Sequence, residues 1–385
     1  MAQRVSGFIA IAAFAVSSTV FAQTVPPAAD PATPAPAPAA AAAPAPAPSN
    51  WTKHGVDIYV LGDIYGDLNF NHPRNGFNNL YNFDDRANQA HLNFTKLSLE
   101  KASGVLGFRV DVGYGRTIDV ISAGDAGPSG MKYLEQVYAE FRPNKTHGLQ
   151  IDFGKFVTSA GAEVIESSSN WNYSRSLLFA WAIPYYHFGA RATLPVNKYF
   201  TTGIQLVNGW NSVGANNKFE TVGIIANFTG KKAVFNNTYY TGPQKEGLID
   251  AYRQVFDSNV VLTPNGKTNL YLNFDAGSDR QHLGPLQKWT GVAAAARFQL
   301  TNRFALAPRL EWFDDIDGFS TGVAQSVKEG TITGEMKLRE GLLARLEFRH
   351  DRSDKPYFDR GTGLMVAKDQ STLALGLLAN FGPKK

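Results

Sequence analysis

Polar and apolar residues alternate along most of the chain after residue 55, and the stretch "GLLARLEFRHD" (341–351) shows the pattern clearly. One set of alternating positions is apolar and the other is mostly charged: Leu342, Ala344, Leu346 and Phe348 against Leu343, Arg345, Glu347 and Arg349. Because successive side chains of a strand point to opposite faces, this segment is predicted to form a strand with one apolar and one charged face. A soluble sandwich would bury the apolar face in its core, whereas an outer-membrane barrel would turn it to lipid and turn the charged face to a wet lumen.

Runs with this period of two recur through the rest of the chain, and helical periodicity is nearly absent. We interpret sixteen of them as strands, which begin near Val56, Ala90, Val105, Tyr133, Leu149, Tyr185, Phe200, Thr221, Ala233, Arg253, Thr268, Thr290, Phe304, Ala324, Leu342 and Ser371. Their spacing fits tilted membrane strands of about 9–11 residues with connections between them.

The connections between these runs alternate in length. Short polar connections lie at 102–104, 143–148, 196–198, 229–232, 263–267, 300–303 and 339–341. Long ones lie at 71–88, 117–132, 157–184, 210–220, 242–251, 277–288, 314–323 and 352–370. A membrane barrel has short turns on the periplasmic side and long loops outside, whereas a soluble sandwich has no reason to sort its loops. The sequence therefore predicts an all-β fold, a transmembrane antiparallel up-and-down β-barrel of about 16 strands.

Charged residues of both signs collect on one face across the predicted strands. The candidates for the pore-lining wall are Arg109, Asp111, Glu140, Arg142, Arg191, Arg309, Glu311, Arg345, Glu347 and Arg349. The alternative is that these residues meet bulk solvent on an ordinary sheet. If they face a lumen, an arginine at Leu346 should be poorly tolerated, whereas an arginine at Glu347 should fold well.

The first 50 residues differ in composition from the rest. Arg4 precedes the short apolar run "FIAIAAFAVSSTV", and residues 1–22 are predicted to be a secretory signal peptide. Residues 23–50 are rich in proline and alanine, so we expect a disordered periplasmic linker before the barrel at 51–385. Cysteine is absent, and the formal net charge is only +4 with acidic and basic residues interleaved, which gives no reason to expect nucleic acid as a partner.

Irregular positions refine the strand assignment. Pro308 lacks an N–H, so a bulge or a missing hydrogen bond is expected there. In "LNFTKLSLE" the alternation changes phase between Phe94 and Leu97, which suggests a bulge in the second strand. Trp210, Trp289 and Trp312 fall where strands should meet the outer membrane interface, a level that tryptophan prefers.

Several segments resemble the OmpL-like outer-membrane β-barrel porins of Gram-negative bacteria. The most specific is "DFGKFVTSAGAEVIESSSNWNYSRSLLF" (152–179), followed by "IPYYHFGARATLPVN" and "LVNGWN". Two further similar segments are "LGFRVDVGYG" (106–115) and "RFALAPRLEWFDDIDGF" (303–319), so the resemblance covers nearly everything after residue 55. It implies a barrel and a diffusion pore, without indicating the solute.

The longest connection, 157–184, is the third on the outer side and carries Glu163, Glu166 and Arg175. The position of this connection resembles that of the third outer loop of general porins, which folds inward and narrows the pore. Its carboxylates opposite wall arginines would create a transverse field that sorts solutes by charge. The alternative is a surface loop held by its aromatic residues.

The predicted function is an outer-membrane porin for passive diffusion of small hydrophilic solutes or ions, in contact with membrane lipid and without a cofactor or metal. A homo-oligomer such as a trimer is common among barrels of this size. A hydrolytic barrel enzyme is one alternative, but "RHDRSD" puts His350 and Asp351 on opposite faces of a strand, and G-x-S-x-G is absent. A structural or adhesive barrel without an open pore is the other, and it requires loops that fill the lumen.

Overall fold

The computed structural model describes residues 51–101, 104–125, 127–215 and 217–383. The predicted signal peptide (1–22) and the linker (23–50) lie outside the described residues and stay predictions.

Seventeen strands form one antiparallel sheet, of which β1 (Thr52–Lys53) has two residues. The other sixteen are β2 (Val56–Asn69), β3 (Ala90–Lys101), β4 (Leu106–Tyr114), β5 (Leu134–Phe141), β6 (Gln150–Val157), β7 (Tyr186–Asn197), β8 (Phe200–Val207), β9 (Thr221–Thr229), β10 (Ala233–Pro243), β11 (Tyr252–Asn265), β12 (Thr268–Arg280), β13 (Leu286–Gln299), β14 (Phe304–Asp315), β15 (Gln325–Arg339), β16 (Leu342–Ser353) and β19 (Asp369–Phe381).

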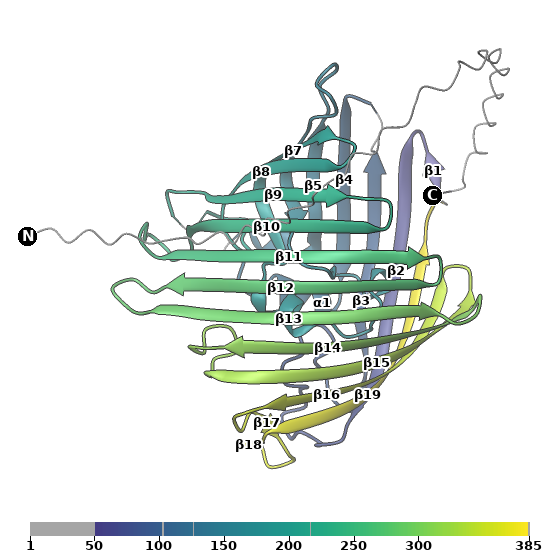
Figure 1. Ribbon diagram of the computed structural model, residues 1–385, viewed down its shortest axis with the longest axis vertical. Coiled ribbons are helices and arrows are strands. Elements are labelled where there is room, and N and C mark those ends of the chain that lie inside the picture. The colour runs from purple at the N-terminus through teal and green to yellow at the C-terminus, as the bar shows by residue number, and fades with distance from the viewer. Residues whose placement is uncertain (1–50, 102–103, 126, 216, 384–385) are drawn as a thin grey trace, which may run out of the picture. The chain divides into compact units, whose positions relative to one another are not determined.

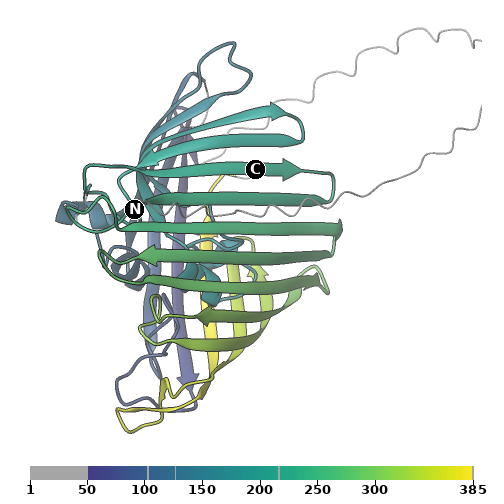
Figure 2. The same ribbon diagram turned by 60° about the vertical axis from the view of Figure 1, so that its left-hand side comes forward.

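Each long strand pairs with the next along the chain, and β19 returns to pair with β2, for example at Leu375 and Gly66. The sheet is therefore a closed barrel. Figure 1 shows one wall, with β9 to β13 in front, and the opposite wall with β2, β3 and β4 behind it, and Figure 2 shows the same strands after a turn of the view. The predicted sixteen-strand antiparallel barrel is confirmed, with strand starts within a few residues of the expected positions.

Short elements occupy the long loops. They are α1 (Arg116–Ile121), η1 (Ser129–Tyr133), η2 (Ser167–Ser169), the π-helical turn η3 (Leu178–Ala182), and the small hairpin of β17 (Phe358–Asp359) and β18 (Met365–Ala367). Long connections such as 70–89 and 158–185 alternate with short ones such as 266–267 and 340–341, as predicted. Within the residues that the structure describes, no helix has the length and apolarity needed to cross a membrane.

The two faces of the wall differ as the alternation predicts. On β16, Leu346 is 54% exposed on the outside, whereas its neighbours Arg345 and Glu347 are 1% and 2% exposed. Aliphatic and aromatic side chains cover the outer face of the other strands in the same way, as at Ile224, Leu310 and Leu375. The outer face is therefore suited to lipid, and the polar face lines the interior.

A closed ladder of inter-strand hydrogen bonds leaves no free edge for detergent to attack. We therefore expect the refolded protein to run at a different apparent mass on a dodecyl sulfate gel before and after boiling. Identical migration at both temperatures, together with recovery in the soluble periplasmic fraction, would contradict a membrane barrel.

The irregular positions were predicted with mixed success. β13 pairs with β14 at Arg309 and again at Leu306, and the pairing skips Pro308, so the missing ladder bond there is confirmed. The bulge in β3 is present but lies at Asn93, one residue before the predicted segment, where the partners of β2 shift from Phe94 to Leu92.

Trp289 contradicts the expected interfacial belt. It is 1% exposed, its indole N–H donates to Ala182 O at 3.1 Å, and its ring packs over Gly277 inside the barrel. Trp312, by contrast, is 39% exposed on the outer surface near the end of β14. The prediction was wrong for Trp289 because it lies on the inward set of alternating positions of β13, where a loop covers it. It was also wrong for Trp210, which packs against the same interior cluster with its ring centre 6.3 Å from that of Trp289.

Candidate functional site

The connection between β6 and β7, residues 158–185, crosses the lumen, and we call it the inward loop. Arginines of the wall hold its backbone on one side. Arg309 donates from Nη1 to Ser174 O at 2.8 Å, and Arg349 donates to Arg175 O at 2.8 Å. Arg345 donates to Asn170 O at 2.5 Å and to Asn172 O at 3.0 Å. Charge-assisted bonds of this kind are stronger than neutral ones, so β14 and β16 anchor the loop firmly.

Glu347 of β16 completes this anchor. Its carboxylate accepts hydrogen bonds from the backbone N–H groups of Tyr173, at 2.5 Å, and Ser174, at 2.9 Å, and from the Thr333 hydroxyl at 2.6 Å. Glu347 is 2% exposed and does not face an open lumen, which was the basis for expecting that an arginine at this position would fold well. An arginine there would remove the only acceptor of these two N–H groups among the bonds that the structure describes, and would place a second cation next to Arg345 on the inner face of β16.

The neighbouring part of the wall, beyond β19, also holds the inward loop. Lys96 of β3 forms ion pairs with Glu166 of the loop and with Glu135 of β5, the latter at 2.6 Å. Asp63 of β2 accepts hydrogen bonds from the Tyr173 hydroxyl at 2.7 Å and from Ser167 at 2.8 Å. In the strand order of the barrel, β14 and β15 lie opposite β6 and β7, between which the loop is inserted, so the loop spans the lumen from β6 and β7 to the far wall.

Apolar residues of the inward loop explain why it leaves the outer surface. Leu177, Leu178, Phe179 and Ile183 are at most 3% exposed and belong to a hydrophobic cluster inside the barrel. Their burial contributes to stability in proportion to the apolar area removed from water. Gly161 supplies the left-handed turn near the start of the loop, with φ of 96°.

A second loop, residues 70–89, packs against the inward loop. Leu80 accepts a hydrogen bond from the Trp181 indole N–H at 2.9 Å, and Tyr81 bonds to Thr372 of β19 at 2.6 Å. Phe83 is fully buried, and the Arg175 guanidinium lies 4.9 Å from the centre of its ring. Burial raises the pKa of the Asp84 carboxyl to about 7, and Arg175 opposes the shift. Sequence reasoning assigned no role to this loop.

Together the loops leave little of the inner wall open. Each of the sixteen long strands carries an inward residue that is at most 7% exposed: Asp63, Lys96, Asp111, Gln136, Phe156, His187, Gln205, Ile225, Thr238, Asp257, Asn273, Ala293, Arg309, Thr333, Glu347 and Ala374. Isoleucines 118 and 121 of α1, each 1% exposed, add to the filling. The inward loop, the loop 70–89 and α1 therefore occupy part of the lumen.

The predicted wall residues lie on the inner face and fall into two groups. Arg309, Glu311, Arg345, Glu347 and Arg349 are buried beneath the inward loop. Arg109, Asp111, Glu140, Arg142 and Arg191 lie on β4 to β7 or next to them, where the accessible fractions of the Arg109, Arg142 and Arg191 side chains are 26%, 41% and 18%. Here arginine pairs with a neighbouring carboxylate, as in Arg109–Asp111 at 2.9 Å.

The three predicted loop residues are placed differently from one another. Glu163 is 5% exposed and pairs directly with Arg309 at 3.0 Å, so no water-filled gap separates this carboxylate from the wall. Arg175 is 2% exposed and donates within its own loop, to Ser167 at 2.9 Å and Ile165 O at 2.7 Å. Glu166 keeps 19% of its side chain accessible.

A polar cavity of about 130 Å³ lies beside Glu166. Its lining includes Lys96 and Arg109 from the wall and Ser168 and Ser169 from the inward loop. Sequence reasoning missed Lys96, and the phase change in "LNFTKLSLE" was the available signal, because the bulge at Asn93 determines which later residues of β3 face inward. Among the described residues, no group of three or more histidine and acidic side chains could hold a metal ion.

The comparisons with known proteins agree with this architecture. Residues 58–381 match the model of a protein family described as "Putative beta-barrel porin-2, OmpL-like". The chain belongs to this family. Membership places it among outer-membrane β-barrel porins, which are channel proteins and not enzymes, and confirms the resemblance noted in the sequence.

Solved porins share the fold at low sequence identity. An anion-selective porin from Comamonas acidovorans superposes with a TM-score of 0.60 at 11% identity, over 85% of this chain and 99% of that chain. OmpT of Vibrio cholerae gives a TM-score of 0.56 at 12% identity, and the channel DcaP of Acinetobacter baumannii gives 0.55 at 9%, each over 85% of this chain and 97% of the other. No curated protein sequence matches the chain.

Proposed function

We propose that the protein is a narrow diffusion channel for small hydrophilic solutes or ions across the outer membrane. The observation that supports the proposal most directly is the inward loop, which crosses a closed barrel with a charged inner face. The more accessible charged residues at its edge, Glu166 and Arg109, give the place where a hydrated solute would meet charge. We further propose that residues 1–22 direct export and that residues 23–50 serve as a periplasmic linker.

Single-channel conductance in a planar bilayer tests this proposal. The wild-type protein should insert and give small, discrete current steps. Shortening the inward loop between Gly161 and Ile183 should raise the conductance, because water would replace protein across the lumen. A wild-type protein that inserts and gives no steps, with a shortened variant that also gives none, would reject a channel.

Ion selectivity should depend on Glu166 and Lys96. Glu166→Gln removes a negative charge at the accessible edge of the loop and should shift the reversal potential toward anions, whereas Lys96→Gln should shift it toward cations. Glu220→Gln makes the same charge change on an exposed outer loop and should leave the reversal potential unchanged. A shift for Glu220→Gln as large as that for Glu166→Gln would show that general surface charge, and not this edge, sets the selectivity.

A structural barrel without an open pore is the second candidate. The presence of a buried inward residue on each of the sixteen long strands favours it. The two candidates differ in the conductance measurement, because a structural barrel stays silent until its loop is shortened. A shortened variant that conducts beside a silent wild type would support the structural candidate.

A further inference from the structure

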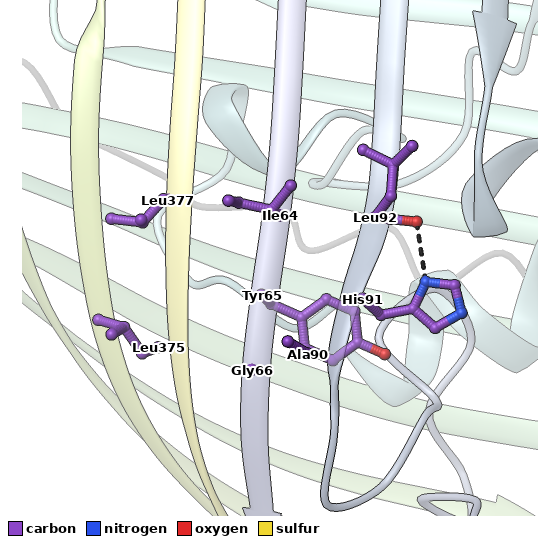
Figure 3. Close-up of a pocket in the computed structure, with 8 residues that line it drawn as sticks. All are labelled: Ile64, Tyr65, Gly66, Ala90, His91, Leu92, Leu375 and Leu377. Atoms are coloured by element: carbon purple, nitrogen blue, oxygen red, sulfur yellow. Dashed lines mark hydrogen bonds between the residues drawn. The ribbon is translucent and has the colours of Figure 1, made fainter.

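A groove on the outer surface of the wall crosses β19, β2 and β3. It has a volume of about 380 Å³, and its sides include Leu375 and Leu377 from β19, Ile64 from β2 and Leu92 from β3. Figure 3 shows these four side chains on three neighbouring strands. Small residues form the floor, since Gly66 and Ala90 pair across β2 and β3 and leave a depression among larger neighbours.

A polar pocket adjoins the groove and shares two residues with it, His91 and Leu92. The pocket has a volume of about 340 Å³ and includes Arg116, Asp119 and Lys132. Figure 3 shows His91 pointing from β3 away from β2. An apolar groove thus continues into a site with two cations.

The position of both features along the wall matches the position of a membrane interface. β3 begins at Ala90, and β4 ends at Tyr114, so the groove lies toward the outer end of the barrel and the pocket lies at its rim. Tyr114 and Tyr133 stack there with ring centres 6.5 Å apart, and both are exposed. Tyrosine prefers the headgroup level of a membrane, which places the pocket at that level and the groove beneath it.

The two cations of the pocket, Arg116 and Lys132, differ in how free they are to bind an anion. Asp85 holds Arg116 in a two-bond ion pair, at 2.9 Å and 2.5 Å. Lys132 is freer, because its side chain is 41% accessible and its ammonium lies 3.9 Å from Asp119 and 4.8 Å from the centre of the Tyr133 ring. A phosphate oxygen that approaches from outside would meet Lys132 first.

We propose that this surface is a binding site for a phosphorylated glycolipid of the outer leaflet. One acyl chain would lie in the groove over Gly66 and Ala90, and a phosphate would lie against Lys132 with Arg116 behind it. Outer-leaflet lipid faces this wall in any case, so the proposal concerns retention of one lipid at a defined place. It does not depend on whether the barrel conducts.

Native mass spectrometry of the full-length, refolded and delipidated protein tests the site, with lipid A carrying two phosphates as the probe. Ala90→Leu fills the groove and should weaken lipid A binding about tenfold. Each methylene group of the acyl chain that no longer fits in the groove lowers the affinity severalfold. Lys132→Ser should also weaken binding and should reduce the preference over lipid A that carries one phosphate. Gly66→Val provides a second groove-filling variant, since no atom lies closer than 3.9 Å to an added Cβ.

The opposite end of the barrel supplies matched controls. A groove of about 290 Å³ at β7 and β8 is lined by Ala192, Leu194 and Ile204, and its lining has no lysine or arginine. Lys198 lies 4.8 Å from the centre of the Tyr199 ring, the same arrangement as Lys132 and Tyr133. Ala192→Leu and Lys198→Ser should therefore bind lipid A as the wild type does.

Two results would overturn the proposal. The first is equal retention of lipid A by all the variants, which would mean that lipid adheres wherever the wall is apolar. The second is a wild-type spectrum of oligomers without lipid that Ala90→Leu converts to monomers, which would show that a second copy of the chain covers the groove. Boiled and unboiled gel migration confirms that each variant is folded.

Discussion

Replacing Arg309 with methionine is expected to lower the free energy of unfolding by about 3–5 kcal/mol, because removal of one partner leaves buried charges uncompensated. The Arg309 guanidinium lies 3.0 Å from Glu163, 3.0 Å from Glu311 and 3.3 Å from Glu329, and its side chain is fully buried. The same change removes the bonds to Ser174, so the inward loop should loosen and the conductance should rise. Urea unfolding in lipid vesicles, followed by tryptophan fluorescence, measures the loss.

Arg360→Met is the control for this change. Arg360 pairs with Asp369 at 2.9 Å, but its side chain is 59% accessible. Exposed ion pairs contribute only about 0–1 kcal/mol, so this variant should unfold close to the wild type. A loss at Arg309 no larger than the loss at Arg360 would mean that the carboxylates around Arg309 are solvated or protonated, and that the loop is held in another way.

Arginine in place of Leu346 is expected to lower the free energy of unfolding by about 2–4 kcal/mol if the residue lies near the bilayer midplane. Leu346 is 54% exposed on the outer face, within β16, and pairs with Leu375 of β19. The cost arises because lipid provides no hydrogen-bond partners for the guanidinium. The same unfolding measurement in vesicles gives its size.

Leu338→Arg makes the same substitution near the end of β15, next to the short turn that precedes β16. Leu338 is 47% exposed, so its packing against protein is similar, and an arginine near the interface costs only about 0–1 kcal/mol. If both variants unfold alike in vesicles, depth in the membrane has no effect, and the outer face of β16 does not meet hydrocarbon.

The alternation of residue types predicted the strands and their two faces, and the alternation of short and long connections then predicted a barrel. Arg345 and Glu347 were assigned to the face opposite Leu346 from spacing alone, and the structure has them there. This prediction succeeds because alternate side chains of a strand point to opposite faces, so the face of each residue follows from local sequence alone. The skipped pairing at Pro308 was predictable for the same reason, since the missing N–H belongs to that residue itself.

The lumen was not predictable in the same way. Glu163 and Arg309 are 146 residues apart, and no local pattern indicates that they touch. The length and polarity of the 157–184 connection suggested an inward course, but did not reveal its anchors on β14, β16, β2 and β3 or the packing of Phe83 beneath Arg175. The roles of Lys96 and Trp289 were missed for the same reason. Whether Lys96 points into the lumen depends on the extra residue in β3. The Trp289 ring lies under Ala182 of the inward loop and not in lipid.

The sequence by itself thus determined the strands, their order, and which of their faces meets lipid, because each of these depends on spacing along one segment. Only the tertiary structure decided how far the lumen is filled. That outcome depends on whether apolar residues such as Leu80 and Leu178 find partners inside the barrel, and on whether wall arginines find the carbonyl oxygens of a distant loop. Such partners are brought together by closure of the sheet and by long-range packing, which no periodicity along the chain records.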